Sequence, residues 1–94
     1  MTKNQHAAWY VYIIRTQADT YYTGITNNVG QRWQDHEKSK RGAKFFRTSK
    51  PAALVYVEKV LNRSHASRRE AVIKQLRRRE KITLIHYQAP VGLP

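Results

Sequence analysis

Two short runs of aromatic and β-branched residues near the start of the chain constrain its fold most strongly. They extend over Trp9–Thr16 and Tyr21–Thr26, with a polar segment at 17–20 between them. Runs of this kind, joined by so few residues, are typical of a β-hairpin. Because side chains alternate between the two faces of a strand, the hairpin can bring Tyr12 of the first run close to Tyr22 of the second.

A helix is expected directly after this hairpin. Asn27 and Asn28 have side chains that cap helix N-termini, and residues 29–38 follow with apolar side chains at helical spacing. Residues 39–51 are expected to form a basic loop with one helical turn. The apolar run at 52–61 then predicts a third strand.

The last third of the chain carries a second helical pattern. Residues 65–79 have an apolar stripe at helical spacing, and Ser64 is the expected N-cap. The stripe consists of Ala66, Val72, Ile73 and Leu76. Apolar residues beyond the stripe indicate that the helix bends or restarts before Tyr87. The order β-β-α-β-α, with this further helical segment, predicts an α/β protein of the α+β type, in which helices flank a small, mainly antiparallel three-stranded sheet.

With 94 residues, the chain has room for a single domain. Its motif-bearing core is expected over about 9–85, with tails at 1–8 and 88–94. There are no cysteines, which excludes disulfides and thiolate metal sites. No apolar segment reaches the roughly 18 residues that would span a bilayer, so we expect a protein of the cytoplasm.

The charge balance favours nucleic acid as the partner. The chain has 18 Lys and Arg against 6 Asp and Glu, a formal net charge of +12. Cations that neutralise phosphates release counterions and supply most non-specific affinity. A membrane surface is disfavoured, because the basic residues are not gathered on one face of an amphipathic helix. DNA is therefore the expected partner, with RNA open as an alternative. The residues expected to contact phosphates are Lys40, Arg41, Lys44, Arg47, Lys50, Arg69, Lys74 and Arg77.

Two aromatic residues, Phe45 and Phe46, lie between Lys44 and Arg47 of this set. Cations interleaved with aromatic rings suit single-stranded or distorted nucleic acid. The ordinary alternative is that both rings are core side chains that anchor the loop.

Four side chains near the hairpin and the first helix could carry chemistry. Tyr12 and Tyr22 can share one face of the sheet, where Gly24 would leave room for a ligand backbone, although aromatic pairs stabilise any hairpin. Arg32 and His36 lie one helical turn apart and suit phosphate binding and proton transfer. The alternative for this second pair is a solvated helix face.

Glu70 is the most specific of the candidate residues. It falls on the apolar stripe of the second helix, where an unpaired carboxylate would cost several kcal/mol. A divalent cation such as Mg²⁺ could be its partner, because Mg²⁺ commonly takes one or two carboxylates and completes its shell with water and phosphate oxygens. A salt bridge to Lys74 or Arg77 explains the residue equally well. Glu58, at the end of the third strand, is expected at the surface.

Together these residues resemble the GIY-YIG endonuclease superfamily, in its small stand-alone bacterial branch. The resemblance covers about 9–85 and extends to the N-terminal incision domain of the bacterial excision-repair nuclease. The matching features are Tyr10-Val11-Tyr12, Tyr22-Thr23-Gly24, the helical Arg32, His36 where relatives carry His or Tyr, the loop Gly42-Ala43-Lys44, and Glu70. Each motif is weak alone, and their order and spacing carry the resemblance.

The resemblance implies hydrolysis of phosphodiester bonds with a single Mg²⁺ or Mn²⁺ held by Glu70. A motif tyrosine, preferably Tyr22, would be the general base, and Tyr12 or His36 would place or relay the proton. Arg32 would stabilise charge on the phosphate. The expected activity is that of a DNA endonuclease or nickase, structure-selective or non-specific, in DNA repair or processing.

Three positions depart from the family pattern. Tyr10 stands where the first motif has its glycine, Ile25 stands where some relatives have a lysine, and the late asparagine of the repair nucleases has no match. These departures motivate the alternative prediction of a non-catalytic nucleic-acid-binding module that keeps the fold and the basic face.

Overall fold

The computed structural model describes residues 8–38 and 43–87. In chain order its elements are β1 (Trp9–Thr16), β2 (Tyr21–Thr26), α1 (Val29–Lys38), the 3₁₀ turn η2 (Lys44–Arg47), β3 (Pro51–Val60), α2 (Arg63–Lys74) and α3 (Arg78–His86). This order confirms the α+β prediction. The hairpin, the first helix and the third strand all lie within one residue of their predicted bounds. None of the described helices is long and apolar enough to cross a membrane.

The three strands form one antiparallel sheet in the order β2-β1-β3, as predicted. β1 is therefore the central strand, paired on both sides. Its Tyr12 lies opposite Gly24 of β2 and opposite Val57 of β3. A register irregularity follows in the pairing with β3, between Ile13 and Ile14.

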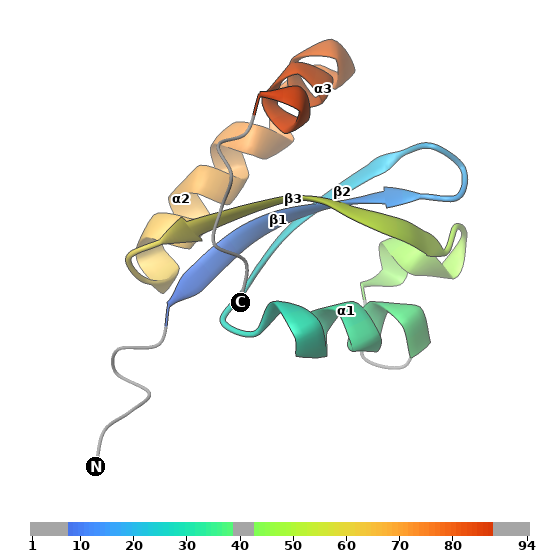
Figure 1. The fold of residues 1–94 in the computed structure, drawn as a ribbon, viewed down its shortest axis with the longest axis horizontal. Coiled ribbons are helices and arrows are strands. Elements are labelled where there is room, and N and C mark those ends of the chain that lie inside the picture. Colours follow the sequence, from blue (N-terminus) through green and yellow to red (C-terminus); the bar gives the residue numbers. More distant parts are fainter. Residues whose placement is uncertain (1–7, 39–42, 88–94) are drawn as a thin grey trace.

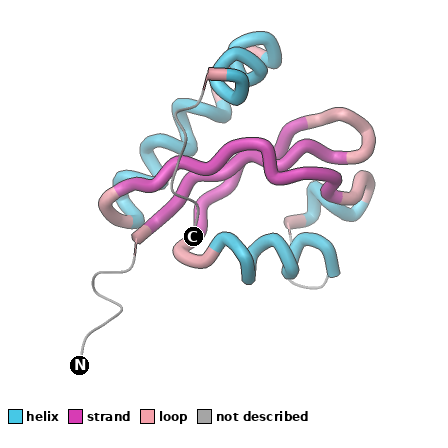
Figure 2. The backbone as a smooth tube through the Cα atoms, in the orientation of Figure 1, coloured by secondary structure: helices cyan, strands magenta, loops and turns pink. Residues whose placement is uncertain are grey.

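Helices cover both faces of the sheet, with α1 and η2 on one side and α2 and α3 on the other (Figure 1). Colouring by secondary structure shows the strands as one twisted layer between the helices (Figure 2). Alternation along β1 separates the two cores: Val11 and Ile13 face α2, whereas Tyr12 and Ile14 face η2.

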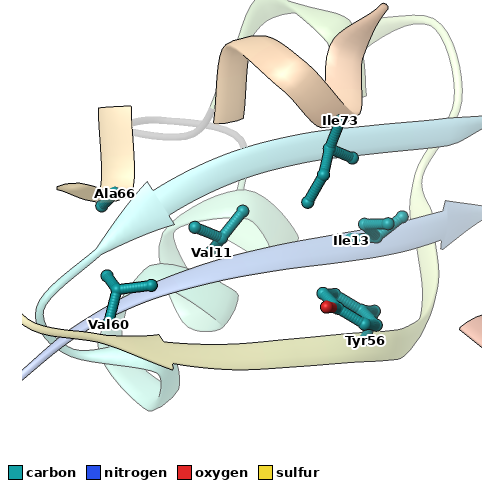
Figure 3. Close-up of a cluster of buried hydrophobic side chains, with 6 residues drawn as sticks. All are labelled: Val11, Ile13, Tyr56, Val60, Ala66 and Ile73. Carbon is teal, nitrogen blue, oxygen red and sulfur yellow. The ribbon is translucent and has the colours of Figure 1, made fainter. Parts of the chain in front are cut away.

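The core beneath α2 is purely structural. It joins β1, β3 and α2 through Val11, Ile13, Tyr56, Val60, Ala66 and Ile73 (Figure 3). Each fully buried aliphatic side chain of this kind contributes about 1.5–3 kcal/mol. The opposite core contains Tyr12, Ile14, Phe46 and Val57, with Tyr22, Val29 and Trp33 packed against it.

The predicted helix at 65–79 is wrong in its bounds. Asn62 is the N-cap in place of Ser64, because its Oδ1 accepts the His65 N–H at 2.8 Å. α2 ends at Lys74, and α3 starts anew where the Glu80 side chain accepts the Arg77 N–H at 2.8 Å. The restart was predicted as one of two options. The prediction that Val72 belongs to the apolar stripe is also wrong, because this residue is 52% exposed.

The basic loop contains the expected helical turn, since Lys44–Arg47 form η2. Lys40 and Arg41 lie outside the described residues. The expected tails also lie outside them, except for Ala8.

Candidate active site

Tyr12 is the centre of the site because three elements meet around its side chain. The residue is 2% exposed, and its ring lies across Gly24. A Cβ atom at Gly24 would stand 2.5 Å from the Tyr12 Oη. The expectation that Gly24 leaves room for a ligand backbone is therefore wrong. The glycine makes room for the tyrosine hydroxyl instead.

His36 holds this hydroxyl from α1. The residue is fully buried, and its Nε2 lies 2.8 Å from the Tyr12 Oη. Its other ring nitrogen, Nδ1, accepts the backbone N–H of Ala43 at 3.2 Å. Because a backbone N–H can only donate, Nδ1 must carry a lone pair, and the neutral ring then has its proton on Nε2. His36 consequently donates its hydrogen bond to Tyr12.

Both groups are neutral near pH 7. Burial lowers the pKa of His36 to about 4, helped by the charge of Arg32 and opposed by Asp35. Burial also raises the pKa of Tyr12 well above its ordinary value, and neighbouring Tyr22 adds to the rise. Arg32 opposes that rise through a hydrogen bond and its positive charge. The hydroxyl of Tyr12 therefore keeps its proton, which points away from His36.

Tyr22 completes an aromatic cluster over the same face. Its ring centroid lies 6.2 Å from that of Tyr12 and 5.3 Å from that of His36. It also contacts Phe46, with centroids 4.9 Å apart. The predicted approach of Tyr12 and Tyr22 is present, and Tyr22 is the more exposed of the two.

Arg32 belongs to the site as well as to the surface of α1. Its Nη1 lies 3.7 Å from Asp35 Oδ2, an ion pair within α1. It also acts on Tyr12 by hydrogen bond and charge. A guanidinium next to the neutral Tyr12 hydroxyl is suited to binding a phosphate.

Glu70 approaches the site from α2. Its side chain is 22% exposed, and its Oε2 lies 3.3 Å from Lys74 Nζ, the alternative partner named from the sequence. Its negative charge adds to the rise of the Tyr12 pKa, so the carboxylate acts on the hydroxyl electrostatically. Glu70 is therefore connected to the site through its electrostatic effect on Tyr12.

The ligands available for a metal fit Mg²⁺ or Mn²⁺ better than zinc. Among the described residues there is no group of three or more His, Cys, Asp or Glu side chains that could hold an ion. Zinc sites need three or four such ligands. Mg²⁺ is satisfied by one or two carboxylates with water and substrate phosphate. Glu70, a partly exposed carboxylate, fits that second type of site.

Glu58 and Arg69 form a contact that the sequence analysis missed. Arg69 Nε lies 2.9 and 3.0 Å from the two Glu58 oxygens, and the Tyr56 hydroxyl donates to the same carboxylate at 2.5 Å. Glu58 is thus part of a β3–α2 contact and not a free surface residue. Tyr56 and Glu58 stand two apart in a strand, a spacing that could have indicated their contact.

Apart from Arg69, which pairs with Glu58, the described cations expected to bind phosphate fall into two groups. Lys44, Arg47 and Lys50 are exposed on and after η2, and Lys74 and Arg77 are exposed at the end of α2. Arg78, which was not predicted, contacts the hairpin: its guanidinium donates to Asp19 Oδ2 at 2.9 Å and lies over the Tyr21 ring at 4.9 Å.

Comparison with known proteins supports the family resemblance. A sequence model of the GIY-YIG catalytic domain matches residues 8–83. A UPF0213 protein of Oceanobacillus iheyensis is 48% identical over 79 residues, covering 84% of this chain and 91% of the relative. A UPF0213 protein of Desulfotalea psychrophila is 46% identical over 78 residues, covering 83% of this chain and 71% of the relative.

A solved structure has the same fold. The solution NMR structure of a UPF0213 protein from Bacillus halodurans superposes with a TM-score of 0.56 at 34% identity, covering 86% of this chain and 85% of that one. The relatives are themselves small proteins, and their names specify no activity.

Proposed function

Because the chain belongs to the GIY-YIG catalytic domain family, which is a nuclease family, we propose that it is a divalent-metal-dependent DNA endonuclease or nickase. Its cleavage would be structure-selective or non-specific, in DNA repair or processing. RNA is the alternative substrate. Residues 9–85 would form the single nuclease domain.

One observation carries this proposal: four other candidate residues act on the hydroxyl of Tyr12. His36 lies 2.8 Å from it, and Tyr22, Arg32 and Glu70 all change its pKa. The five residues come from β1, β2, α1 and α2. Packing of a hairpin explains the tyrosine pair, but it does not explain a cation and a carboxylate whose charges both act on the same hydroxyl.

In this proposal Tyr12 positions the reacting groups. Its proton points away from His36, so it can donate to a phosphate oxygen or to the attacking water. His36 cannot take a proton from Tyr12 while its Nε2 carries one and its Nδ1 accepts from Ala43. Its role is therefore to orient Tyr12, and the relay through His36 considered from the sequence is disfavoured.

Tyr22 is the proposed general base. It is more exposed than Tyr12, and its ring packs against Tyr12 and against Phe46 of η2. Arg32 would bind the phosphate and stabilise the charge that develops on it. Tyr22→Phe should therefore reduce hydrolysis more than Tyr12→Phe.

Glu70 would hold the metal ion, which would replace Lys74 as the partner of the carboxylate. When bound, Mg²⁺ or Mn²⁺ would act as a Lewis acid on the phosphate and stabilise the leaving oxygen. Both roles require an ionised carboxylate at position 70, and this requirement makes Glu70 the most direct test of the proposal.

The test is the conversion of supercoiled plasmid to nicked circles by purified protein, with Mg²⁺, Mn²⁺ or a chelator. Glu70→Gln keeps the size of the side chain and removes its charge, and we expect nicking to fall at least a hundredfold while DNA binding in chelator is retained. Glu37→Gln removes an exposed carboxylate of α1 and should nick at the wild-type rate. Equal metal-dependent nicking by Glu70→Gln would exclude this mechanism.

The second candidate is a nucleic-acid-binding module without turnover. The Glu70–Lys74 ion pair at 3.3 Å favours it, because an ammonium group there competes with a metal for the carboxylate. This candidate predicts binding without products on nicked, branched, single-stranded and duplex substrates. Lys74→Ala tests it further, since freeing Glu70 should not create activity if the function is binding alone.

A further inference from the structure

Two adjacent phenylalanines have opposite environments beside the site. Phe46 is 1% exposed and belongs to the core with Tyr12, whereas Phe45 is 39% exposed. Both stand in the 3₁₀ turn η2, which directs successive side chains in different directions. Core packing therefore explains Phe46 and leaves the exposure of Phe45 unexplained.

Phe45 is held firmly despite its exposure. Its ring packs against Phe46, with centroids 5.6 Å apart and an interplanar angle of 81°. It also packs against Tyr22, with centroids 5.4 Å apart. The Thr48 hydroxyl donates to the Phe45 carbonyl at 3.2 Å, which fixes the end of the turn. A ring held in this way loses little conformational freedom when a ligand stacks on it.

The surroundings of Phe45 select the ligand. The neighbouring Lys44 and Arg47 are exposed cations, and Tyr22 connects the ring directly to the candidate catalytic residues. An apolar aromatic surface flanked by positive charges suits a nucleotide, with its base on the ring and its phosphates on the cations. In a duplex the faces of the bases are already stacked, so only an unpaired base can use this ring.

We propose that Phe45 is a stacking platform for an unpaired base next to the phosphate to be cleaved, so that the substrate class is single-stranded or locally unpaired nucleic acid. This inference rests on the proposed nuclease function for the location of the reacting phosphate. The stacking itself needs no catalysis and can be measured separately.

The experiment measures binding in chelator, where no cleavage occurs, at one fixed salt concentration. Phe45→Ala should weaken binding to a single-stranded oligonucleotide about tenfold and binding to the matching duplex less than twofold. Phe45→Trp should restore single-strand binding. A 2-aminopurine base in the oligonucleotide reports stacking by its quenched fluorescence, and Phe45→Ala should relieve that quenching.

Two matched variants separate stacking from other effects. Phe45→Leu keeps an apolar side chain on Phe46 but has no aromatic face, and it should bind single strands as weakly as Phe45→Ala. Arg47→Ala should weaken binding to single strands and duplex alike, because a phosphate contact does not distinguish them. Thermal unfolding of each variant checks that the fold is retained.

Equal loss of single-strand and duplex binding in Phe45→Ala, or full binding by Phe45→Leu, would overturn the stacking platform. If instead binding behaves as expected and no substrate is cut, the nuclease function fails while the base subsite stands. Selective cleavage of intact duplex over single strands by the wild-type protein would also contradict the proposed substrate class.

Discussion

His36 is the residue whose charge state is most tightly controlled. It is fully buried, its two ring nitrogens are occupied by Tyr12 and Ala43, and Arg32 repels its charged form. Protonation would place an N–H against the Ala43 N–H and a charge in the core. The neutral ring is therefore part of the folded structure and of the site at the same time.

This environment predicts that the protein loses stability below pH 6.5. The unfolded chain binds a proton at His36 near pH 6.5, and the folded protein does so only near pH 4. Between these values the unfolded state binds more protons, so the free energy of unfolding falls as the pH decreases. The contribution of His36 is full above pH 6.5, and roughly 2 kcal/mol of it is lost by pH 5.

Urea unfolding between pH 7 and 5 measures this loss, in a range where carboxylates titrate little. His36→Gln keeps an N–H for Tyr12 and cannot be protonated, so its free energy of unfolding should change much less with pH. The same slope in both proteins would show that another group causes the wild-type dependence.

Alternation along the strands was enough to predict that Tyr12 and Tyr22 meet. The role of Gly24 could not be predicted, because it depends on which ring fills the space across the sheet, and Tyr12 Oη does so. The burial of His36 could not be predicted either. Its helical spacing placed it one turn from Arg32, and its burial depends on the packing of Phe46 of η2 against its ring.

At the scale of elements, α2 connects the site to the structural core. One side of it contributes Ala66 and Ile73 to the core of Figure 3, and Glu70 lies between them in sequence. Its position on the sheet is also fixed by the contact from Arg69 to Glu58 of β3. A shift of α2 would therefore move Glu70 relative to Tyr12.

We predict that Arg69 supports the docking of α2 more than it binds DNA. Arg69→Ala leaves the Glu58 carboxylate half-buried without its cation, and it should lower the free energy of unfolding by about 1–2 kcal/mol. Arg68→Ala removes a more exposed arginine of the same helix and should cost less than about 0.5 kcal/mol. Chemical denaturation measures both values.

DNA affinity, measured on the same two variants, distinguishes the roles. If Arg69 acts through the fold, the two variants bind DNA equally under conditions where both are folded. A loss of affinity in Arg69→Ala alone, without a loss of stability, would assign Arg69 to the phosphate-binding surface predicted from the sequence.

The elements themselves were predictable where the apolar pattern was regular. The hairpin and β3 were predictable from runs of apolar residues, and α1 from its N-cap and its helical spacing. The boundary between α2 and α3 could not be predicted, because Gln75, Leu76 and Arg77 are all acceptable within a helix. The break depends on the Glu80 side chain capping a new helix, and on Leu84 and Ile85 reaching the core.

At the scale of the whole molecule, the sheet separates a structural core from a functional one. The face under α2 and α3 is filled by aliphatic side chains together with Tyr56, and the face under α1 and η2 carries Tyr12, Tyr22, His36 and the phenylalanines. The sequence could predict the two faces from alternation. It could not predict that Glu70, from a helix on the first face, acts on Tyr12 on the second, because that depends on how α2 lies on the sheet.

The net charge of +12 predicts a strong dependence of DNA binding on salt. For a single strand, log K should fall linearly with log salt by about 0.7 for each phosphate that is neutralised. Arg77 and Lys50 are exposed cations of the set predicted to contact phosphates, so Arg77→Ala and Lys50→Ala should each reduce this slope by about 0.7. Lys59→Ala removes the same charge from an exposed position of β3 outside the predicted surface, and its slope should equal that of the wild type. Fluorescence anisotropy measures the slopes of the wild type and the three variants. One oligonucleotide is titrated at salt concentrations of about 50 to 300 mM. Equal changes in all three variants would mean that DNA is attracted by the net charge of the whole molecule, and not by a defined set of phosphate contacts near the site.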